Sequence, residues 1–211
     1  MRFAPFSRSF FFSLTLLPVI LCTVLSCSHA PQFSAAEESG EVRSGGAAPG
    51  RSFGESPIYR EDFSSFSNAD WRLDEGWELQ NTGGESFLQG RGHNWAVFQP
   101  YLAQDYRLAC RIRLDAGELH LVLRLGQKGR YFVNLGPSGT MLSKQLWPDT
   151  FIHGLAGSNT PFRRGRWHRV EIVLQSDRIT LTVDGERQWS YSDPEPLEST
   201  DFGFETLPDS R

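Results

Sequence analysis

The chain has 211 residues, of which 39% are hydrophobic and 22% charged, a composition that fits a globular domain and excludes a disordered or fibrous chain. Its formal net charge is −4, and the first 26 residues contain two basic side chains and no acidic one, so the rest carries 19 basic against 25 acidic residues. A negative field repels phosphate backbones, which argues against general nucleic-acid binding.

Residues 1–26 have the layout of a secretory signal peptide. Met1 to Arg8 is short and basic, and Ser9 to Leu25 is almost wholly apolar. The alternative is a permanent transmembrane anchor, but the apolar run is slightly shorter than the ~20 residues that span a bilayer, and Pro18 interrupts it. The pattern therefore predicts export from the cytoplasm.

The residues after the apolar run predict where the leader is cut. Val24-Leu25-Ser26-Cys27 resembles the lipobox of bacterial lipoproteins, in which a small residue precedes the cysteine that receives the lipid. Cleavage after Ser28-His29-Ala30 is the alternative, but Pro31 would then follow the scissile bond. We expect lipid attachment at Cys27, a membrane anchor of several acyl chains, and a place in the bacterial outer membrane or at the cell surface.

Residues 27–56 follow as a flexible linker behind the lipidated cysteine. The segment from Ser28 consists mostly of Ser, Gly, Ala, Glu and Pro, with few large apolar side chains to bury. Such a segment cannot offset the entropy lost on ordering. We expect the folded domain to occupy residues 57–211.

Two-residue alternation dominates the domain. In 106–114 the even positions are apolar, which places Cys110 in the core, and the odd positions are mostly arginine. Segments 119–125 and 131–135 also have the composition of strands, and glycine-containing turns separate them. Cys110 is the only cysteine beyond the leader region, so no internal disulfide is expected.

Two further strands are expected at 167–174 and 179–183. Asp184-Gly185 after the second is a strong signal for a two-residue hairpin turn. Strict pairing across that turn would put Trp189 opposite Thr180, away from the apolar face of the strand, so either a bulge restores the register or the second face is covered too. No segment of helical length shows a convincing 3.6-residue period.

Short strands with Gly and Pro turns and hardly any helix predict an all-β domain of two packed antiparallel sheets. Four early aromatic residues fit this architecture as core residues near the first strand: Phe63, Phe66, Trp71 and Trp77.

The region from Tyr59 onward resembles the concanavalin A-like lectin/glucanase superfamily, the jelly-roll sandwiches that include laminin G-like domains. The resemblance rests on the order and spacing of short motifs: Glu61-Asp62-Phe63, Trp71, Gly76-Trp77, the strands at 106–114 and 131–135, the Trp-x-x-Val-x-Ile pattern from Trp167, Asp184-Gly185, and Phe202-Gly203-Phe204-Glu205. It implies a jelly-roll fold, which hosts enzymes, lectins and adhesion modules alike.

The chain differs from two enzyme families of this fold in the motifs that those families share. Laminarinase-type glycosidases resemble one another in a Glu-x-Asp-x-x-Glu strand that supplies the catalytic carboxylates, and the chain lacks this triplet. The 3-keto-disaccharide hydrolase-like family has a similar layout, but its Asn-Ser-Gly turn and Tyr-Glu strand are replaced by Glu118-Leu119-His120 and Arg130-Tyr131-Phe132. The sequence therefore favours binding over catalysis.

Outward-facing side chains on neighbouring strands give the candidate site. Aromatic rings beside hydrogen-bonding groups suit sugars, whose C–H faces stack while their hydroxyls bond to planar polar groups. The segment Leu146 to Phe162 is expected to be a long, aromatic-rich functional loop. The alternative is an ordinary solvated sheet face. The predicted ligand-binding residues are His120, Arg124, Phe132, Asn134, Lys144 and Trp147.

No cofactor or metal site is predicted, because no two of the domain histidines have metal-ligand spacing. The superfamily resemblance implies a structural calcium ion as an option, without identifying ligands. The expected function is a lipid-anchored, extracytoplasmic carbohydrate-binding module whose partner is a glycan or a cell-envelope component. The alternatives are a glycoside hydrolase-like enzyme and a structural, protein-binding envelope module.

The end of the domain carries a further expectation. In sandwiches of this type, a segment like Phe202-Gly203-Phe204-Glu205 is followed by one more strand that returns to the sheet near the first strand. That strand is missing before Arg211. We expect either a longer reading frame or an exposed sheet edge beside the N-terminal strand.

Overall fold

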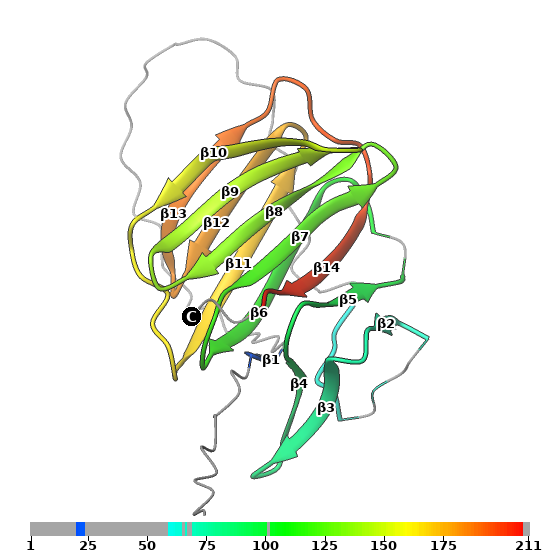
Figure 1. The fold of residues 1–211 in the computed structure, drawn as a ribbon, viewed down its shortest axis with the longest axis vertical. Coiled ribbons are helices and arrows are strands. Elements are labelled where there is room, and N and C mark those ends of the chain that lie inside the picture. Colours follow the sequence, from blue (N-terminus) through cyan, green and yellow to red (C-terminus); the bar gives the residue numbers. More distant parts are fainter. Residues whose placement is uncertain (1–19, 24–58, 65, 67–68, 101, 209–211) are drawn as a thin grey trace, which may run out of the picture.

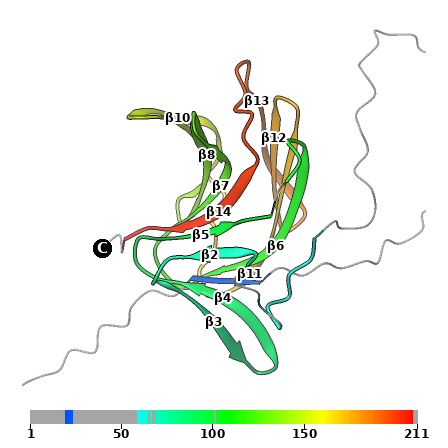
Figure 2. The same cartoon turned by 90° about the vertical axis from the view of Figure 1, so that its right-hand side faces the viewer.

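The computed structural model describes residues 20–23 and 59–208, apart from 65, 67–68 and 101. Every regular element in this part of the chain is a β-strand. None of it forms a helix long and apolar enough to cross a membrane. The strands make two seven-stranded sheets, which face each other as the layers of a sandwich (Figure 1, Figure 2).

All strand pairings are antiparallel. Sheet A contains, in spatial order, β13 (Glu186–Ser192), β12 (Arg178–Val183), β11 (Trp167–Gln175), β6 (Tyr106–Leu114), β1 (Ile20–Thr23), β4 (Glu85–Gly90) and β3 (Trp77–Thr82). Sheet B contains β10 (Thr150–Ser158), β9 (Gly139–Leu146), β8 (Gly129–Gly136), β7 (Leu119–Gly126), β14 (Asp201–Thr206), β5 (Asn94–Phe98) and β2 (Trp71–Leu73).

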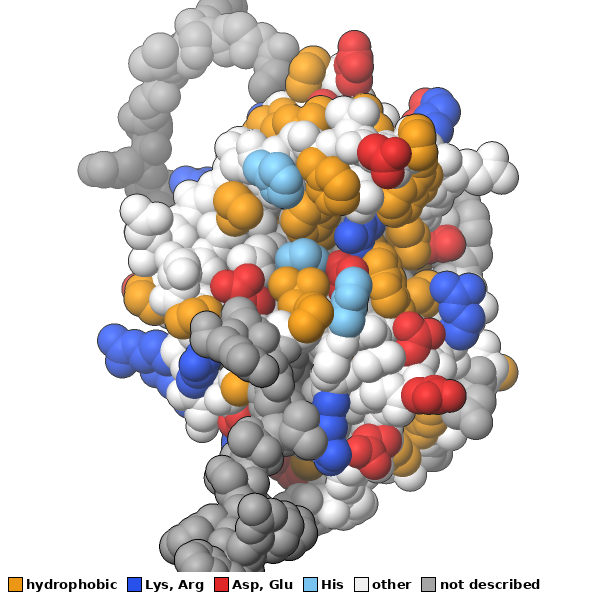
Figure 3. Space-filling model, in the orientation of Figure 1, with side chains coloured by type: hydrophobic (Ala, Val, Ile, Leu, Met, Phe, Trp, Pro, Cys, Tyr) orange, Lys and Arg blue, Asp and Glu red, His pale blue; other side chains and the backbone are white. Residues whose placement is uncertain are grey.

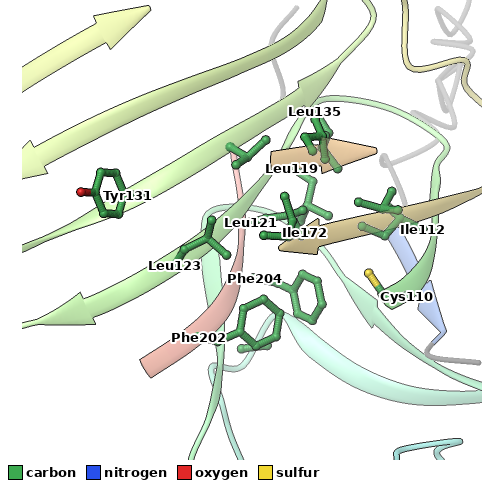
Figure 4. Close-up of a cluster of buried hydrophobic side chains, with 14 of the residues drawn as sticks. Cys110, Ile112, Leu119, Leu121, Leu123, Tyr131, Leu135, Ile172, Phe202 and Phe204 are labelled. Carbon is green, nitrogen blue, oxygen red and sulfur yellow. The ribbon is translucent and has the colours of Figure 1, made fainter. Parts of the chain in front are cut away.

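The core lies between the sheets and is built by the alternation within each strand. The leucines at 119, 121 and 123 of β7 point inward and are fully buried, as is Phe204 of β14. Figure 4 shows them packed with Ile112 and Ile172 of sheet A. Because neighbours along a strand face opposite ways, the residues between these inward positions point away from the core, and these outward positions of sheet B form the candidate site.

The structure confirms the predicted all-β, two-sheet fold. The expected strands at 106–114, 119–125, 131–135, 167–174 and 179–183 correspond to β6, β7, β8, β11 and β12. Cys110 is buried in the core, as expected. Phe63, Trp71 and Trp77 are also core residues, and Phe66 packs against them partly buried.

The Asp184-Gly185 turn joins β12 and β13, with both residues at positive φ. The register shifts between Leu181 and Thr182, and Trp189 consequently pairs with Leu181. The bulge, one of the two expected solutions, thus returns Trp189 to the core side, where its Nε1 donates to the Thr140 hydroxyl at 3.0 Å.

The expectation of a loop over residues 146–162 is wrong. Thr150–Ser158 is strand β10, which pairs with β9 and forms one edge of sheet B. The register shifts between Ile152 and Ala156, and Gly154 within the shift has a φ of +69°. This bulge interrupts the two-residue alternation, so the segment lacks the usual pattern of a strand.

Strand β1 belongs to the predicted signal peptide, and its backbone lies between β4 and β6. It pairs with β4 from Gly90 to Leu88 and with β6 from Leu114 to Arg111. Within residues 59–208, no described strand occupies this position. The exposed edge expected beside the N-terminal strand therefore stays a prediction, as do lipid attachment at Cys27 and the linker over residues 27–56, which lie outside the described residues.

Candidate functional site

A buried carboxylate lies at the centre of the outer face of sheet B. Glu205 of β14 follows the inward-facing Phe204 and therefore points outward, between His120 of β7 and Trp95 of β5. Its side chain is only 4% exposed and accepts three bonds, at 2.8 Å from His120 Nδ1, 3.0 Å from His93 Nε2 and 2.7 Å from Arg130 Nη1. Burial raises the pKa of Glu205, but the hydrogen bonds from the two histidines and the Arg130 charge outweigh it and lower the pKa to about 2.

The ionised carboxylate fixes the chemistry of both histidines. A carboxylate only accepts hydrogen bonds, so His120 Nδ1 and His93 Nε2 each carry a proton. Their other ring nitrogens form no hydrogen bond within the described structure. The side chain of His93 is 54% exposed and that of His120 is 13% exposed. The cluster therefore presents histidine ring nitrogens to a ligand, and the carboxylate already fixes the orientation of these rings.

Arg130 of β8 is held on every side. Its Nε donates to Gln145 Oε1 at 2.8 Å, in addition to the bond to Glu205. The guanidinium carbon lies 4.6 Å from the ring centre of Trp95 and 5.1 Å from that of Phe132. A guanidinium between two rings and bonded to two acceptors is rigid, which makes this part of the face preorganised.

A row of rings runs from this cluster to the sheet edge. His120 and Phe132 lie 4.7 Å apart, Phe132 and His153 6.3 Å, and His153 stacks on Phe151 at 5.6 Å and 3°. Ser143 of β9, opposite Phe132, is small and fully buried, and its hydroxyl has no partner among the described residues. In Figure 3, histidine and hydrophobic side chains gather over the middle of this face around charged groups.

Three of the predicted site residues lie on this face. His120 and Phe132 belong to the cluster and the ring row described above. Asn134 pairs with His120 across β7 and β8, and its amide donates to Glu118 Oε2 at 3.0 Å. Its own amide oxygen is buried without a partner among the described residues.

The outward placement expected for Arg124 is wrong, and Lys144 also lies on the inner side. A register shift follows Leu123, and Arg124 adopts a φ of +48°, so its guanidinium turns inward and donates at 2.7 Å to Ser176 O, in the turn between β11 and β12. Lys144 Nζ lies 2.8 Å from Asp193 Oδ2 and is 8% exposed. Arg124 Nη1 also donates to Leu197 O at 3.0 Å, so both side chains hold the connection between β13 and β14, not the outer face.

Trp147 lies in the turn between β9 and β10. Its side chain is 40% exposed, and its indole Nε1 donates to Gly126 O at 2.8 Å. Its backbone N–H bonds to Lys128 O at 3.1 Å. These bonds attach Trp147 to the β7–β8 turn, at the end of the strands that carry Arg130 and Gln145.

Sequence reasoning missed the centre of the site. The alternation of Phe202 and Phe204 already places Glu205 outward, but nothing local shows that β14 lies between β5 and β7. His93 and Trp95 reach the carboxylate and Arg130 only through this long-range pairing.

Two hollows of the described structure lie away from the Glu205 cluster. One hollow lies against Trp71 and Gln99, and a second against Arg111 and Trp167 on sheet A. Within the described chain, no group of three or more His, Cys, Asp or Glu side chains is arranged to hold a metal ion. At the cluster, Glu205 already faces three N–H donors, which leaves it unsuited to ligate a cation.

Comparison with known proteins agrees with this architecture. The family model described as the laminin G domain matches residues 101–205. The carbohydrate-binding module CBM66 from Bacillus subtilis superposes with a TM-score of 0.54 at 15% identity, covering 66% of this chain and 89% of that module. The domain has the concanavalin A-like jelly-roll fold.

Further solved structures share the same jelly roll. A GH16 protein of the Bacteroides ovatus mixed-linkage glucan PUL, solved with a G4G4G3G product, has a TM-score of 0.54 at 9% identity, covering 73% of this chain and 88% of that one. LamAcat from Zobellia galactanivorans has a TM-score of 0.52 at 8% identity, with 74% and 89% covered. A search of curated proteins gave no match.

Proposed function

We propose that this chain is a glycan-binding module of the cell envelope and that the outer face of sheet B around Glu205 is its binding surface. The observation that carries the proposal is the row of rings from His120 to Phe151, which ends on a fixed cluster of charged and polar groups. Rings stack on the C–H faces of sugars, and the histidine nitrogens bond to hydroxyls. The jelly-roll likeness to a carbohydrate-binding module supports the proposal at the level of the fold.

The chemistry of Glu205 favours binding over hydrolysis. A glycosidase needs a carboxyl group that donates a proton near neutral pH and a second carboxylate about 5–10 Å away. The pKa of Glu205 is lowered to about 2, and its two oxygens already accept three bonds. In this state the carboxylate positions Arg130 and the histidines and does not transfer a proton.

The site is tested by binding and by product formation in parallel. A glycan array is probed with the purified protein and with Phe151→Ala, which removes a 49% exposed ring from the row. Leu79→Ala is the matched control, since Leu79 is 44% exposed but belongs to sheet A. We expect weaker glycan binding for Phe151→Ala alone.

Two outcomes contradict the proposal. Equal loss in both variants, or no glycan bound at all, removes sheet B as a glycan surface and favours the protein-binding module. New reducing ends after incubation with oligosaccharides identify the hydrolase alternative.

The module is proposed to reach its glycan from a lipid anchor. Cys27 is the attachment site, residues 28–56 are the tether, and the location is the bacterial outer membrane or cell surface. Cys27→Ser is expected to abolish labelling with a lipid precursor and to release a soluble form. A variant that stays membrane-bound at full length would show instead that the leader is an uncut anchor.

A further inference from the structure

The outer face of sheet A carries an arginine pair that stands out from its neighbours. Arg111 of β6 and Arg169 of β11 are direct cross-strand partners. Both point outward, because Cys110, Ile112 and Val170 beside them are buried in the core. Like charges directly opposite each other on neighbouring strands destabilise the pairing. The sequence thus places a repulsive pair where a neutral one would favour the fold.

The other arginines of β6 each have a carboxylate partner. Arg107 bonds to Glu171 and Arg113 to Asp115, both at 2.7 Å. Among the described residues, the one carboxylate partner of Arg111 is Glu85 at 3.8 Å, whose side chain is 59% exposed. Within the described chain, the Arg169 guanidinium has no hydrogen bond or ion pair. Positive charge at this pair is therefore largely uncompensated.

Asp184 lines the same hollow as the pair, but its carboxylate is already bonded to other groups. Its carboxylate binds the Arg166 side chain, the His168 ring and the backbone N–H of Arg169. Burial raises the pKa of Asp184, but these hydrogen bonds lower it below the ordinary value. Asp184 is thus an ionised anchor for the turn that carries Arg166 and lies beside the pair.

The two arginines border a hollow of about 300 Å³. Ala109, a small outward residue next to Arg111 on β6, lines it and leaves room. Trp167 lines it from β11, and the Arg111 guanidinium lies over its ring at 4.9 Å. The hollow therefore places two guanidinium groups beside an aromatic ring, and the Asp184 carboxylate that also lines it is bonded to Arg166, His168 and the Arg169 backbone.

We infer that this hollow is an anion site for a sulfate or phosphate monoester group carried by a sugar, with Arg111 and Arg169 on the oxyanion and Trp167 against the sugar ring. Guanidinium groups match tetrahedral oxyanions in bidentate geometry, and a bound anion removes the repulsion between the two arginines. The site lies on the opposite sheet from the glycan face and stands independently of it.

Thermal unfolding of the full-length protein tests the oxyanion part. Sulfate is compared with chloride at equal ionic strength in the wild type, in Arg169→Gln and in Arg107→Gln, whose arginine is already paired. Sulfate also stabilises proteins without binding them, so the comparison among variants decides. A bound anion is expected to add about 2–4 °C to the wild-type Tm, and the gain is lost only in Arg169→Gln.

The repulsion between Arg111 and Arg169 can also be measured without sulfate. In chloride alone, Arg169→Gln is expected to melt no lower than the wild type, whereas Arg107→Gln melts slightly lower because Glu171 loses its partner. If sulfate raises the Tm equally in all three proteins, the proposed anion site is overturned.

The sugar part is tested with glucose 6-sulfate, glucose 6-phosphate, glucose and inorganic sulfate. Esters are expected to bind at least tenfold more tightly than inorganic sulfate, a preference that disappears in Trp167→Ala while inorganic sulfate still binds. Equal affinity for the ester and the bare ion overturns the aromatic contact. Binding to phosphatidylglycerol vesicles without binding to the soluble esters overturns the sugar and identifies a membrane-docking face.

Discussion

Strands β8 and β9 carry two charge clusters on adjacent rungs, one on each face of sheet B. Arg130 pairs with Gln145 across the strands and faces outward, and the next pair, Tyr131 with Lys144, faces inward. Each cluster contains a buried cation bonded to a carboxylate, Glu205 outside and Asp193 inside. The same two strands thus give a direct comparison between a candidate binding site and a structural ion pair.

The inner cluster is closed to a ligand, because its charged side chains are buried and bonded to other groups of the domain. Lys144 bonds to Asp193 and to Glu195 O, and the Tyr131 hydroxyl donates to Asp193 while accepting from Leu197 N–H. Burial raises the pKa of Asp193, but the bonds from Lys144 and Tyr131 lower it below the ordinary value. All of these groups join β8 and β9 to the segment between β13 and β14.

The outer cluster differs by having a half-exposed member and adjoining rings. The side chain of His93 is 54% exposed, whereas those of Arg130 and Glu205 are below 10%. The buried groups fix the exposed one, and the ring row extends from them. Both clusters contain buried, paired charges, so these charges do not distinguish a binding site from a structural ion pair. The difference is that the outer cluster has hydrogen-bonding groups at the surface that are not yet used.

Lys144→Met should give the largest effect on stability, and none on glycan binding. It leaves the Asp193 charge buried without its cation, a change that costs about 3–5 kcal/mol in buried pairs. Urea unfolding measures the loss, and Lys128→Met, at an exposed position, is the matched control. The double variant with Asp193→Asn should recover part of it. A loss no larger than that of Lys128→Met would show that the inner pair contributes little.

The outer carboxylate should be visible in the pH dependence of stability. Because the pKa of Glu205 is about 2 in the folded state and 4.5 in the unfolded state, its contribution is complete above about pH 4.5 and is lost as the pH falls through about 2. The shift corresponds to about 3 kcal/mol. The difference in free energy of unfolding between the wild type and Glu205→Gln, followed from pH 5 to pH 2, should shrink over this window. A difference that stays constant would place the stabilising charge elsewhere.

The sequence predicts the inward and outward faces well wherever the alternation is unbroken. Cys110, His120 and Phe132 all lie on the expected side. Arg124 does not, because a bulge with a left-handed backbone reverses its direction, and no local pattern marks that bulge. Bulges depend on pairing with a partner strand, which the sequence of one strand does not contain.

Lys144 illustrates a different limit of prediction from the sequence. It shares the parity of the buried Leu142, so alternation alone places it inward. A lysine is buried only when a partner compensates its charge, and that partner, Asp193, lies far along the chain. Glu205 was missed for a related reason: its outward direction is readable, but its histidine partners come from β7 and the residue before β5.

Trp147→Ala should give the smallest of these effects, and its meaning depends on a second variant. If the 40% exposed indole stacks on bound glycan, its loss should cost about 1–3 kcal/mol, or roughly 5- to 150-fold in affinity. The indole also donates to Gly126 O, so its removal alters the β7–β8 turn as well.

Trp147→Phe keeps a ring but loses that bond. Stacking predicts that affinity, measured by calorimetry, falls for alanine and largely recovers for phenylalanine. Equal losses in the two variants would assign Trp147 to holding the turn, and unchanged affinity in both, with the fold intact, would remove it from the glycan face.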